Sequence, residues 1–359
     1  MHSVCFITDP LVTTMGAVRP AILLAKEFRR KGHEVTIIAP RFDRAVQKKL
    51  LEEDFLLMDV GPRFSFIPSL PTLDAWGRCL VTKKPVAEIN CSDFVVNTSS
   101  CIISQAQAYY AQGPMTRALD DLFPQMPMHY KYSYRIMRST LRILERRLVR
   151  RFRDQSKLFI ANSVFCGSMY EKWGITVDAI ISPPLDCSLF EPKTANPTGD
   201  YVLTHFGTFG KEGKLSTVKA IANSGVPIRV FGDSARVPQH LKKHPMISFL
   251  GKVADAELAY LYSNALYTLF AFEHEPFGYI PVESMACGTP VLTYRRQGPS
   301  ETVANGKTGW LSSNDREMVN LALLLWKKGY SGDVRNECRK RALAFDVKKT
   351  ATVWENTLN

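Results

Sequence analysis

The sequence has no Asp-x-Asp motif, no closely spaced cysteine pair and no apolar stretch of bilayer length. Without the acidic motif there is no sign of a carboxylate-held divalent cation, so no metal is expected. The eight cysteines lie far apart, which disfavours a zinc knuckle or a small disulfide framework and favours reduced thiols in a cytoplasmic protein. The stretch 1–8 lacks a basic leader and a long apolar core, so we expect no segment integral to a membrane.

Two further absences concern ligands. The turn after the first predicted strand has no glycine-rich dinucleotide fingerprint, which disfavours a nicotinamide enzyme. No basic segment with interleaved aromatic residues is present, so no nucleic-acid partner is expected. What is present is a chain of 359 residues with 45% hydrophobic residues, enough for two globular domains. Its formal net charge of +12 predicts attraction to an anionic surface or a phosphorylated ligand.

The chain alternates between strand and helix patterns. Apolar runs at 4–7 and 34–39 predict buried strands, and 20–31 predicts an amphipathic helix that ends before Gly32. Such alternation favours a parallel sheet with helices on both faces, where ligands bind at the carboxyl ends of the strands. The polar stretch 191–199, which contains two prolines, predicts a linker, and the alternation restarts after it.

The most informative segment is 273–292, which contains Glu275 and Glu283. Pro276 and Gly278 predict a loop, and a short helix is predicted to follow and to contain Glu283. At such an entry into a helix, the backbone N–H groups of residues 277–280 suit a phosphate or a polyhydroxylated ring. The same spacing also occurs in an ordinary capped helix, so the spacing alone leaves both interpretations open.

The surrounding residues favour the first interpretation. The segment resembles the donor-site signature of the retaining glycosyltransferases of the GT-B fold, specifically glycosyltransferase family 4. The resemblance covers most of the chain and is closest to the mannosyltransferase-like subgroup. Further matches, in the same order along the chain, are 161–163, 181–186, 207–214, 249–251, 255–258, 298–301 and 305–310.

The resemblance implies an α/β fold with two Rossmann-like, doubly wound parallel-sheet domains that face a cleft. We expect an N-terminal acceptor-side domain over 1–195 and a nucleotide-sugar-binding domain over 196–340. The last segment, 341–359, is expected to form a helix that crosses back to the N-terminal domain.

The resemblance also implies roles for single residues. Glu275 would bind hexose hydroxyls and Glu283 the ribose, while the backbone of Phe277, Gly278, Tyr279 and Ile280 would hold the sugar and the phosphates. Lys214 would neutralise the diphosphate, and Lys214 and Glu275 are the predicted catalytic residues. The remaining donor-side predictions are Gly16 near the phosphates, Lys211 in the glycine-rich turn, and Gly232 and Val253 near the base.

Two positions depart from the family pattern. The family usually has an arginine where this chain has Thr208, so Lys211 or Arg19 would take its place. The family's histidine near the reaction centre corresponds to Thr98, which leaves Arg19 and Thr98 as acceptor-side or phosphate-side residues. His129, His205 and His274 are alternative proton-transfer groups, although a single histidine is more often structural.

The segment 132–153 predicts a strongly basic amphipathic helix. Its apolar residues recur at helical spacing, as do six of its arginines. We expect the apolar face to join the domain core. The basic face is interpreted with equal weight as solvated or as a contact for a membrane or a lipid phosphate.

These patterns together predict a metal-independent, retaining hexosyltransferase that uses a nucleotide-sugar donor as substrate and needs no cofactor. The acceptor is expected to be lipid-linked or a glycan, and the protein to be cytoplasmic and peripheral on an anionic inner membrane surface. The alternatives are a catalytically impaired GT-B subunit that binds a nucleotide sugar or a glycan, and a nucleotide-sugar epimerase.

Overall fold

The computed structural model describes residues 2–61, 70–81, 93–123, 126, 128–207, 214–233, 237–272 and 275–358. The chain divides into two compact units. The first contains Met1–Arg117, Tyr132–Pro184 and Val347–Asn359, and the second contains Ala118–Lys131 and Leu185–Asp346. The division at Pro184 lies before the boundary predicted after residue 195, and the final segment of the first unit begins at Val347 instead of at residue 341.

The first unit is built on a parallel sheet, for which the described residues supply seven strands. In spatial order these are β3 (Leu56–Asp59), β2 (Glu34–Ala39), β1 (Ser3–Ile7), β4 (Phe94–Asn97), β5 (Ala106–Ala111), β6 (Ser156–Ala161) and β7 (Ala179–Ile180). Successive strands run outward on one side from β1 and on the other side from β4. The carboxyl ends of β1 and β4 therefore form a topological switch point, where ligands of open α/β sheets bind.

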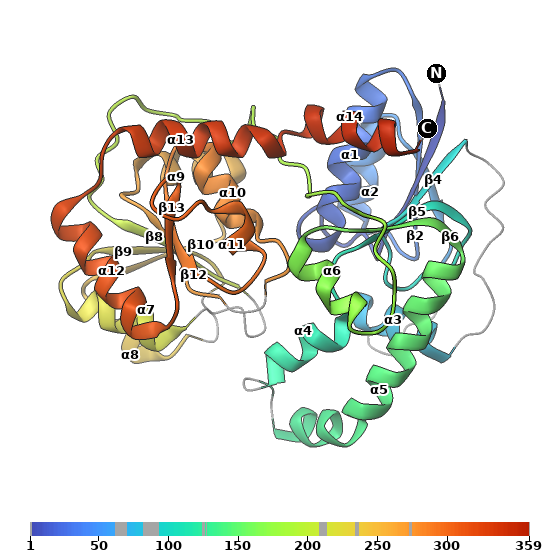
Figure 1. Ribbon diagram of the computed structural model, residues 1–359, viewed down its shortest axis with the longest axis horizontal. Coiled ribbons are helices and arrows are strands. Elements are labelled where there is room, and N and C mark those ends of the chain that lie inside the picture. The colour runs from blue at the N-terminus through green and yellow to red at the C-terminus, as the bar shows by residue number, and fades with distance from the viewer. Residues whose placement is uncertain are drawn as a thin grey trace. The chain divides into compact units, whose positions relative to one another are not determined.

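Helices of the first unit lie beside this sheet (Figure 1). They are α1 (Arg19–Arg30), preceded by the 3-10 turn η1 (Gly16–Val18), α2 (Arg44–Glu52), α3 (Pro71–Val81), α6 (Val164–Glu171) and α14 (Val347–Leu358). Two further helices, α4 (Met115–Leu122) and α5 (Met128–Asp154), have residues in both units. The side chains of Asp43 and Ser163 cap α2 and α6 by accepting hydrogen bonds from backbone N–H groups of the first turn.

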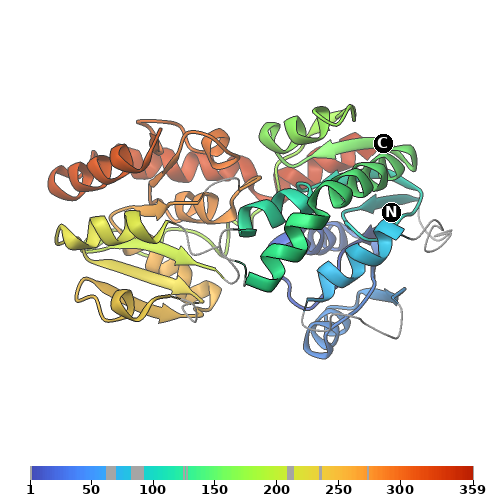
Figure 2. The same cartoon turned by 90° about the horizontal axis from the view of Figure 1, so that it is seen from below.

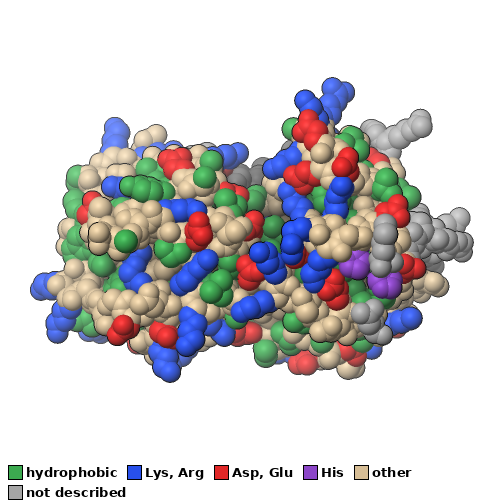
Figure 3. All heavy atoms as spheres, turned by 90° about the horizontal axis from the view of Figure 1, so that it is seen from above, with side chains coloured by type: hydrophobic (Ala, Val, Ile, Leu, Met, Phe, Trp, Pro, Cys, Tyr) green, Lys and Arg blue, Asp and Glu red, His purple; other side chains and the backbone are tan. Residues whose placement is uncertain are grey.

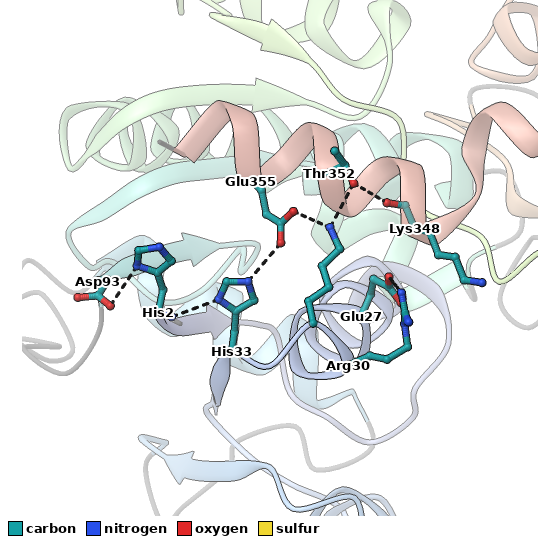
Figure 4. A network of polar contacts seen from close by, with 9 residues as sticks. His2, Glu27, Arg30, His33, Asp93, Lys348, Thr352 and Glu355 are labelled. Atoms are coloured by element: carbon teal, nitrogen blue, oxygen red, sulfur yellow. Dashed lines mark hydrogen bonds and ion pairs between the residues drawn. The ribbon is translucent and has the colours of Figure 1, made fainter.

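The last helix belongs to the core of the first unit. Trp354 of α14 is 1% exposed, and its ring meets that of Tyr110 edge to face at 5.2 Å. A polar network fixes the same helix to the connection between α1 and β2 (Figure 4). In it Glu355 accepts one hydrogen bond from Lys31 at 2.5 Å and is 3.2 Å from the ring of His33. The C-terminal segment thus completes the N-terminal unit.

The second unit is built on a second parallel sheet, with six strands among the described residues. Their order is β10 (Ile247–Gly251), β9 (Ile228–Gly232), β8 (Val202–Phe206), β11 (Thr268–Phe270), β12 (Val291–Tyr294) and β13 (Gly309–Ser312). The chain order reverses between β8 and β11, so the switch point of this sheet lies at their carboxyl ends.

Helices cover both faces of the second sheet (Figure 2). They are α7 (Leu215–Asn223), α8 (Gln239–Lys242), α9 (Asp255–Asn264), α10 (Tyr279–Ala286), α11 (Pro299–Thr302), α12 (Asp315–Lys328) and α13 (Asp333–Ala342), followed by the 3-10 turn η3 (Leu343–Phe345). In the part of the chain that the structure describes, no helix is both long enough and apolar enough to cross a membrane.

Candidate functional site

Lys214 lies at the switch point of the second sheet. It is the N-cap residue of α7, which follows β8, and its backbone N–H donates a 3.0 Å hydrogen bond to the carbonyl of Ala271, just after β11. The bond joins the loop that precedes α7 to the segment that leads to Glu275. The two predicted catalytic residues therefore belong to neighbouring loops at one sheet edge.

The ammonium group of Lys214 is held by two residues that the sequence did not single out. It lies 2.7 Å from a carboxylate oxygen of Asp315 and 5.0 Å from the ring centre of Tyr294. The hydroxyl of Tyr294 donates to the same carboxylate at 2.7 Å. Burial opposes ionisation of Asp315, but the hydrogen bonds from Lys214 and Tyr294 outweigh it and lower the pKa of that carboxyl.

The loop that carries Glu275 is fixed by its backbone. The N–H of Glu275 donates to the side-chain carbonyl of Gln297 at 3.1 Å, and the carbonyl of Glu275 accepts from the N–H of Gly298 at 3.0 Å. A side chain at Gly298 would lie 2.0 Å from the carbonyl oxygen of Pro276, so only glycine allows this approach. The match at 298–301 thus has a structural reason, namely support of the Glu275 loop.

Gly278 is the N-cap residue of α10 and has a φ of +85°, a backbone conformation that favours glycine. A Cβ atom there would lie 2.8 Å from the ring of Pro299. Phe277 is 3% exposed and its ring packs against those of Tyr279 and Phe345, so its side chain belongs to the core. Ile280 also packs on that core. Backbone N–H groups at the start of a helix lack partners within it and suit an anion.

Glu283 lies in α10 and is 3% exposed. Its carboxylate accepts a 3.0 Å hydrogen bond from the hydroxyl of Tyr262 in α9. A ribose hydroxyl would have to share this carboxylate with Tyr262. The predicted ribose role stays a prediction.

Two other predicted donor residues follow strands of this sheet. Gly232 ends β9 with a φ of +103°, and a Cβ atom there would meet the carbonyl oxygen of Phe206 at 2.1 Å. Val253 follows β10 and packs against the core of the unit. Lys211 and Thr208 lie outside the described residues.

In the first unit, the predicted residues surround the switch point between β1 and β4. Gly16 opens η1 with a φ of +71°, and Arg19 begins α1 and is 5% exposed. Thr98 follows β4, and both its N–H and its hydroxyl donate to the carbonyl of Ile7, at 2.8 and 3.0 Å. Thr98 therefore joins the ends of the two central strands.

Asp9, which the sequence did not single out, is a buried carboxylate at this switch point. It is 6% exposed, and one carboxylate oxygen accepts from the hydroxyl of Ser99 at 2.9 Å, the N–H of Ser100 at 2.8 Å and the thiol of Cys101 at 3.3 Å. Burial raises the pKa of Asp9, and the hydrogen bonds lower it by less. One sign of this role was present in the sequence, because Asp9 lies two residues after the apolar strand β1.

The histidines occupy different surroundings. The ring of His205 in β8 lies 4.9 Å from that of Phe231 and 6.0 Å from that of Phe272, which is an aromatic environment. His274 and the side chain of His129 lie outside what the structure describes. Among the described residues, no group of three His, Cys, Asp or Glu side chains is placed to hold a metal ion.

Comparison with known proteins identifies the class. The backbone aligns with the crystal structure of Anabaena Alr3699/HepE in complex with UDP with a TM-score of 0.70, at 18% identity and over 99% of each chain. The same protein in complex with UDP-glucose aligns with a TM-score of 0.68, at 17% identity and over 100% of this chain and 99% of the other. Two doubly wound parallel sheets and these neighbours define a GT-B fold, as predicted.

Sequence comparison then gives the group. Residues 218–344 match the family described as glycosyl transferases group 1. Alpha-1,3/1,6-mannosyltransferase alg2 of Schizosaccharomyces pombe is 40% identical over 73 residues, which is 20% of this chain and 14% of that protein. The chain matches only 14 to 19% of the length of the first three curated relatives. This family match lies within the second unit.

Proposed function

We propose that the protein transfers a hexose from a nucleotide-sugar donor, with retention of configuration and without a metal ion, to a lipid-linked or glycan acceptor. The observation that supports this proposal most directly is the bond between Lys214 N–H and the Ala271 carbonyl, which brings a lysine and the Glu275 loop to one switch point. It occurs next to the segment that matches group 1 glycosyltransferases. Assignment to family 4 belongs to the same proposal.

In this proposal, each part of the donor meets a suitable group. Lys214 and the N–H groups of residues 277–280 balance the charge of the departing diphosphate. Glu275 accepts hydrogen bonds from the hexose, Glu283 accepts one from the ribose, and Gly232 and Val253 lie beside the base. Lys211 and Gly16 add phosphate contacts.

The acceptor side of the proposal uses the first unit. Arg19 and Thr98 surround the switch point between β1 and β4, where a polar acceptor would bind. We propose a cytoplasmic protein that is peripheral on an anionic inner membrane surface, because the chain has a net charge of +12 and the expected acceptor is lipid-linked. No cofactor is required beyond the donor itself.

The test is release of nucleoside diphosphate from a panel of UDP-, GDP- and ADP-hexoses, measured with chelator and with or without a membrane extract. Release from one donor in the presence of chelator is expected, and dependence on the extract would identify a lipid-linked acceptor. Release that occurs only after a divalent cation is added would contradict metal independence. An isomerised donor without diphosphate release would indicate an epimerase.

A second candidate is a catalytically impaired GT-B subunit that binds a nucleotide sugar or a glycan. The ion pair between Lys214 and Asp315 favours it, because a carboxylate 2.7 Å away reduces the positive charge available to a diphosphate. This subunit would be stabilised thermally by one donor and would release no diphosphate from it under any condition of the panel.

A further inference from the structure

Helix α5 has two different halves. Towards its C-terminus, Leu148 and Phe152 are 3% and 2% exposed, and Phe152 stacks on Tyr109 at 4.6 Å. This part of the expected apolar face joins the core. In the N-terminal half Met137, on the same face, is 51% exposed. The first turns of α5 extend away from the sheet of the first unit (Figure 1).

A second apolar stripe, which the sequence analysis did not recognise, lies on the outward side of α5. Tyr132, Ile136 and Ile143 are 63%, 80% and 55% exposed. At 3.6 residues per turn, these three side chains lie within about 40° of one another and about 180° from Phe152. We call these three residues the outer stripe. The stripe points away from the side of α5 that is buried against the core.

The residues around the outer stripe are positively charged. Arg135, Arg142 and Arg146 flank it on one side, while Arg147 and Arg150 continue it towards the C-terminus. All five are exposed. The surface around the stripe is therefore apolar in the middle and cationic at the edges.

The one acidic side chain of the stretch 132–153 faces away from these arginines. Glu145 is the one acid between residues 132 and 153, and it is 2% exposed. Its carboxylate faces α4, where it accepts hydrogen bonds from the N–H groups of Met115 and Thr116, at 2.5 and 3.0 Å, and from the hydroxyl of Thr116. Because Glu145 is used as a cap for α4, it does not reduce the attraction of the outward face for anions.

We propose that the outer stripe docks on the surface of an anionic lipid bilayer. Ile136 and Ile143 would enter the boundary between headgroups and acyl chains, Tyr132 would lie at headgroup level, and the flanking arginines would contact lipid phosphates. This inference deepens the membrane partner proposed above and rests on that proposed function. It names the surface that makes the contact.

The chemistry of the outer stripe favours a bilayer over a second copy of the chain or a nucleic acid. A second copy of the chain would bring two rows of arginines face to face, which is repulsive. A nucleic acid would satisfy the arginines but would leave two isoleucines in contact with phosphates and water. An anionic bilayer offers a phosphate layer and an apolar layer at adjacent depths, and so matches both parts.

The first experiment is co-sedimentation of the full chain with phosphatidylcholine vesicles that contain about one quarter phosphatidylglycerol. We expect binding to these vesicles, little binding to pure phosphatidylcholine, and weakening in high salt. The variant Ile136→Ser/Ile143→Ser should partition at least about tenfold more weakly. The matched control is Leu324→Ser/Val353→Ser, which alters two apolar side chains that are 47% and 48% exposed on other helices, and it should bind as the wild type does.

A second pair of variants tests the charge. Arg147→Gln/Arg150→Gln should weaken binding and reduce its dependence on salt. Its control is Lys48→Gln/Lys340→Gln, which removes the same charge from side chains that are 79% and 80% exposed elsewhere. Equal loss in the control would show that net charge, and not this surface, causes the binding, and would overturn the proposal.

The remaining outcomes are equally decisive. The proposal is wrong if the wild type does not bind anionic vesicles, or if Ile136→Ser/Ile143→Ser binds them as the wild type does. It is also wrong if the isoleucine substitutions dissociate a dimer, which would assign the stripe to a second copy. The assay contains no donor sugar, and donor-induced thermal stabilisation of each variant reports folding and the donor site separately. Failure here is therefore distinguishable from failure of the proposed transferase activity.

Discussion

The two sheets present different groups at equivalent places. At the switch point of the second sheet, the side chain of Lys214 is 31% exposed and lies above an aromatic ring. At the switch point of the first sheet lies the carboxylate of Asp9, which is 6% exposed and accepts from hydroxyl, thiol and N–H donors. The same topology therefore offers a cation suited to phosphate in one unit and a carboxylate suited to hydroxyl groups in the other.

The two switch points also differ in which residues hold the charged side chain in place. Lys214 and the Glu275 loop are held by Ala271 just after β11, by Gln297 after β12 and by Asp315 in α12. Asp9 is held by three consecutive residues after β4. Unlike Lys214 and Asp9, which have defined partners, the basic side chains on the face shown in Figure 3 are spread among acidic ones. Substitutions at the two switch points can therefore separate a role in turnover from a role in folding.

The largest effect is expected for Lys214→Ala. If Lys214 neutralises the departing diphosphate, its removal should lower kcat by about 100- to 1000-fold with a smaller change in KM, because the charge grows in the transition state. Steady-state kinetics with the accepted donor measures this effect. The matched control is Lys219→Ala, an exposed lysine in the same helix, which should behave as the wild type does. Unchanged kcat in both variants would remove Lys214 from the site.

A smaller effect is expected for Glu283→Gln, which keeps the shape but loses the charge. Tyr262 can still donate to the amide oxygen, so folding should be preserved. A ribose hydroxyl would lose a charge-assisted acceptor, which corresponds to about 1 to 2 kcal/mol, or roughly tenfold weaker donor binding. Titration with the nucleoside diphosphate measures it. Exposed Glu257→Gln in α9 is the control, and equal affinity in both would contradict the ribose role.

The sequence predicted the second switch point better than the first. Glu275, Gly278 and Gly298 lie in short motifs, because a loop that approaches another backbone closely requires glycines at defined positions. The strands were predictable for a related reason, since the strands of a buried parallel sheet are continuous apolar runs.

Other features could not be predicted, because they depend on which strands become neighbours. Asp9 meets Ser100 only because β1 pairs with β4, across 91 positions of sequence. Lys214 meets Asp315 across 101 positions because α7 packs beside α12. On α5, the periodic apolar residues included Phe152 of the core, but Ile136 and Ile143 were not recognised as a second apolar stripe, because they fall outside that period.

Asp9→Asn tests whether the first switch point serves function at a cost in stability. Burial raises the pKa of Asp9, so its contribution to stability is complete below the unfolded value of 3.8 and is lost as pH rises through the folded value. An uncharged asparagine does not suffer that loss. The variant should therefore become more stable relative to the wild type as pH rises from about 4 to about 7.

Although Asp9→Asn should gain stability at neutral pH, its activity should fall if Asp9 orients Ser100 towards an acceptor hydroxyl. We expect a higher acceptor KM with the donor KM unchanged, and Ser100→Ala should show the same split. Denaturant unfolding at several pH values and kinetics with both substrates measure the two effects. An Asp9→Asn enzyme with unaltered acceptor KM would leave Asp9 with a structural role only.

The smallest effect is expected for Glu355→Gln, which tests how the C-terminal helix contributes to the first unit. Burial opposes ionisation of Glu355, but the hydrogen bonds and charges of Lys31 and His33 outweigh it and lower its pKa below 4.5. The ionised side chain therefore contributes stability above pH 4.5, and this contribution is lost as pH falls through the folded value. Its side chain is 23% exposed, so we expect a loss of about 1 kcal/mol near neutral pH.

The prediction is checked by measuring unfolding free energies at several pH values, with Glu34→Gln as the control variant. The difference in unfolding free energy between wild type and Glu355→Gln should shrink towards zero in acid, whereas Glu34→Gln, at an exposed position of β2, should show little difference at any pH. Hydrogen exchange of α14 locates the effect. Protection should fall along α14 first, because Trp354 keeps the helix in the core only while the polar network holds its last turn. Uniform loss across both units would mean that α14 does not act within the first unit alone.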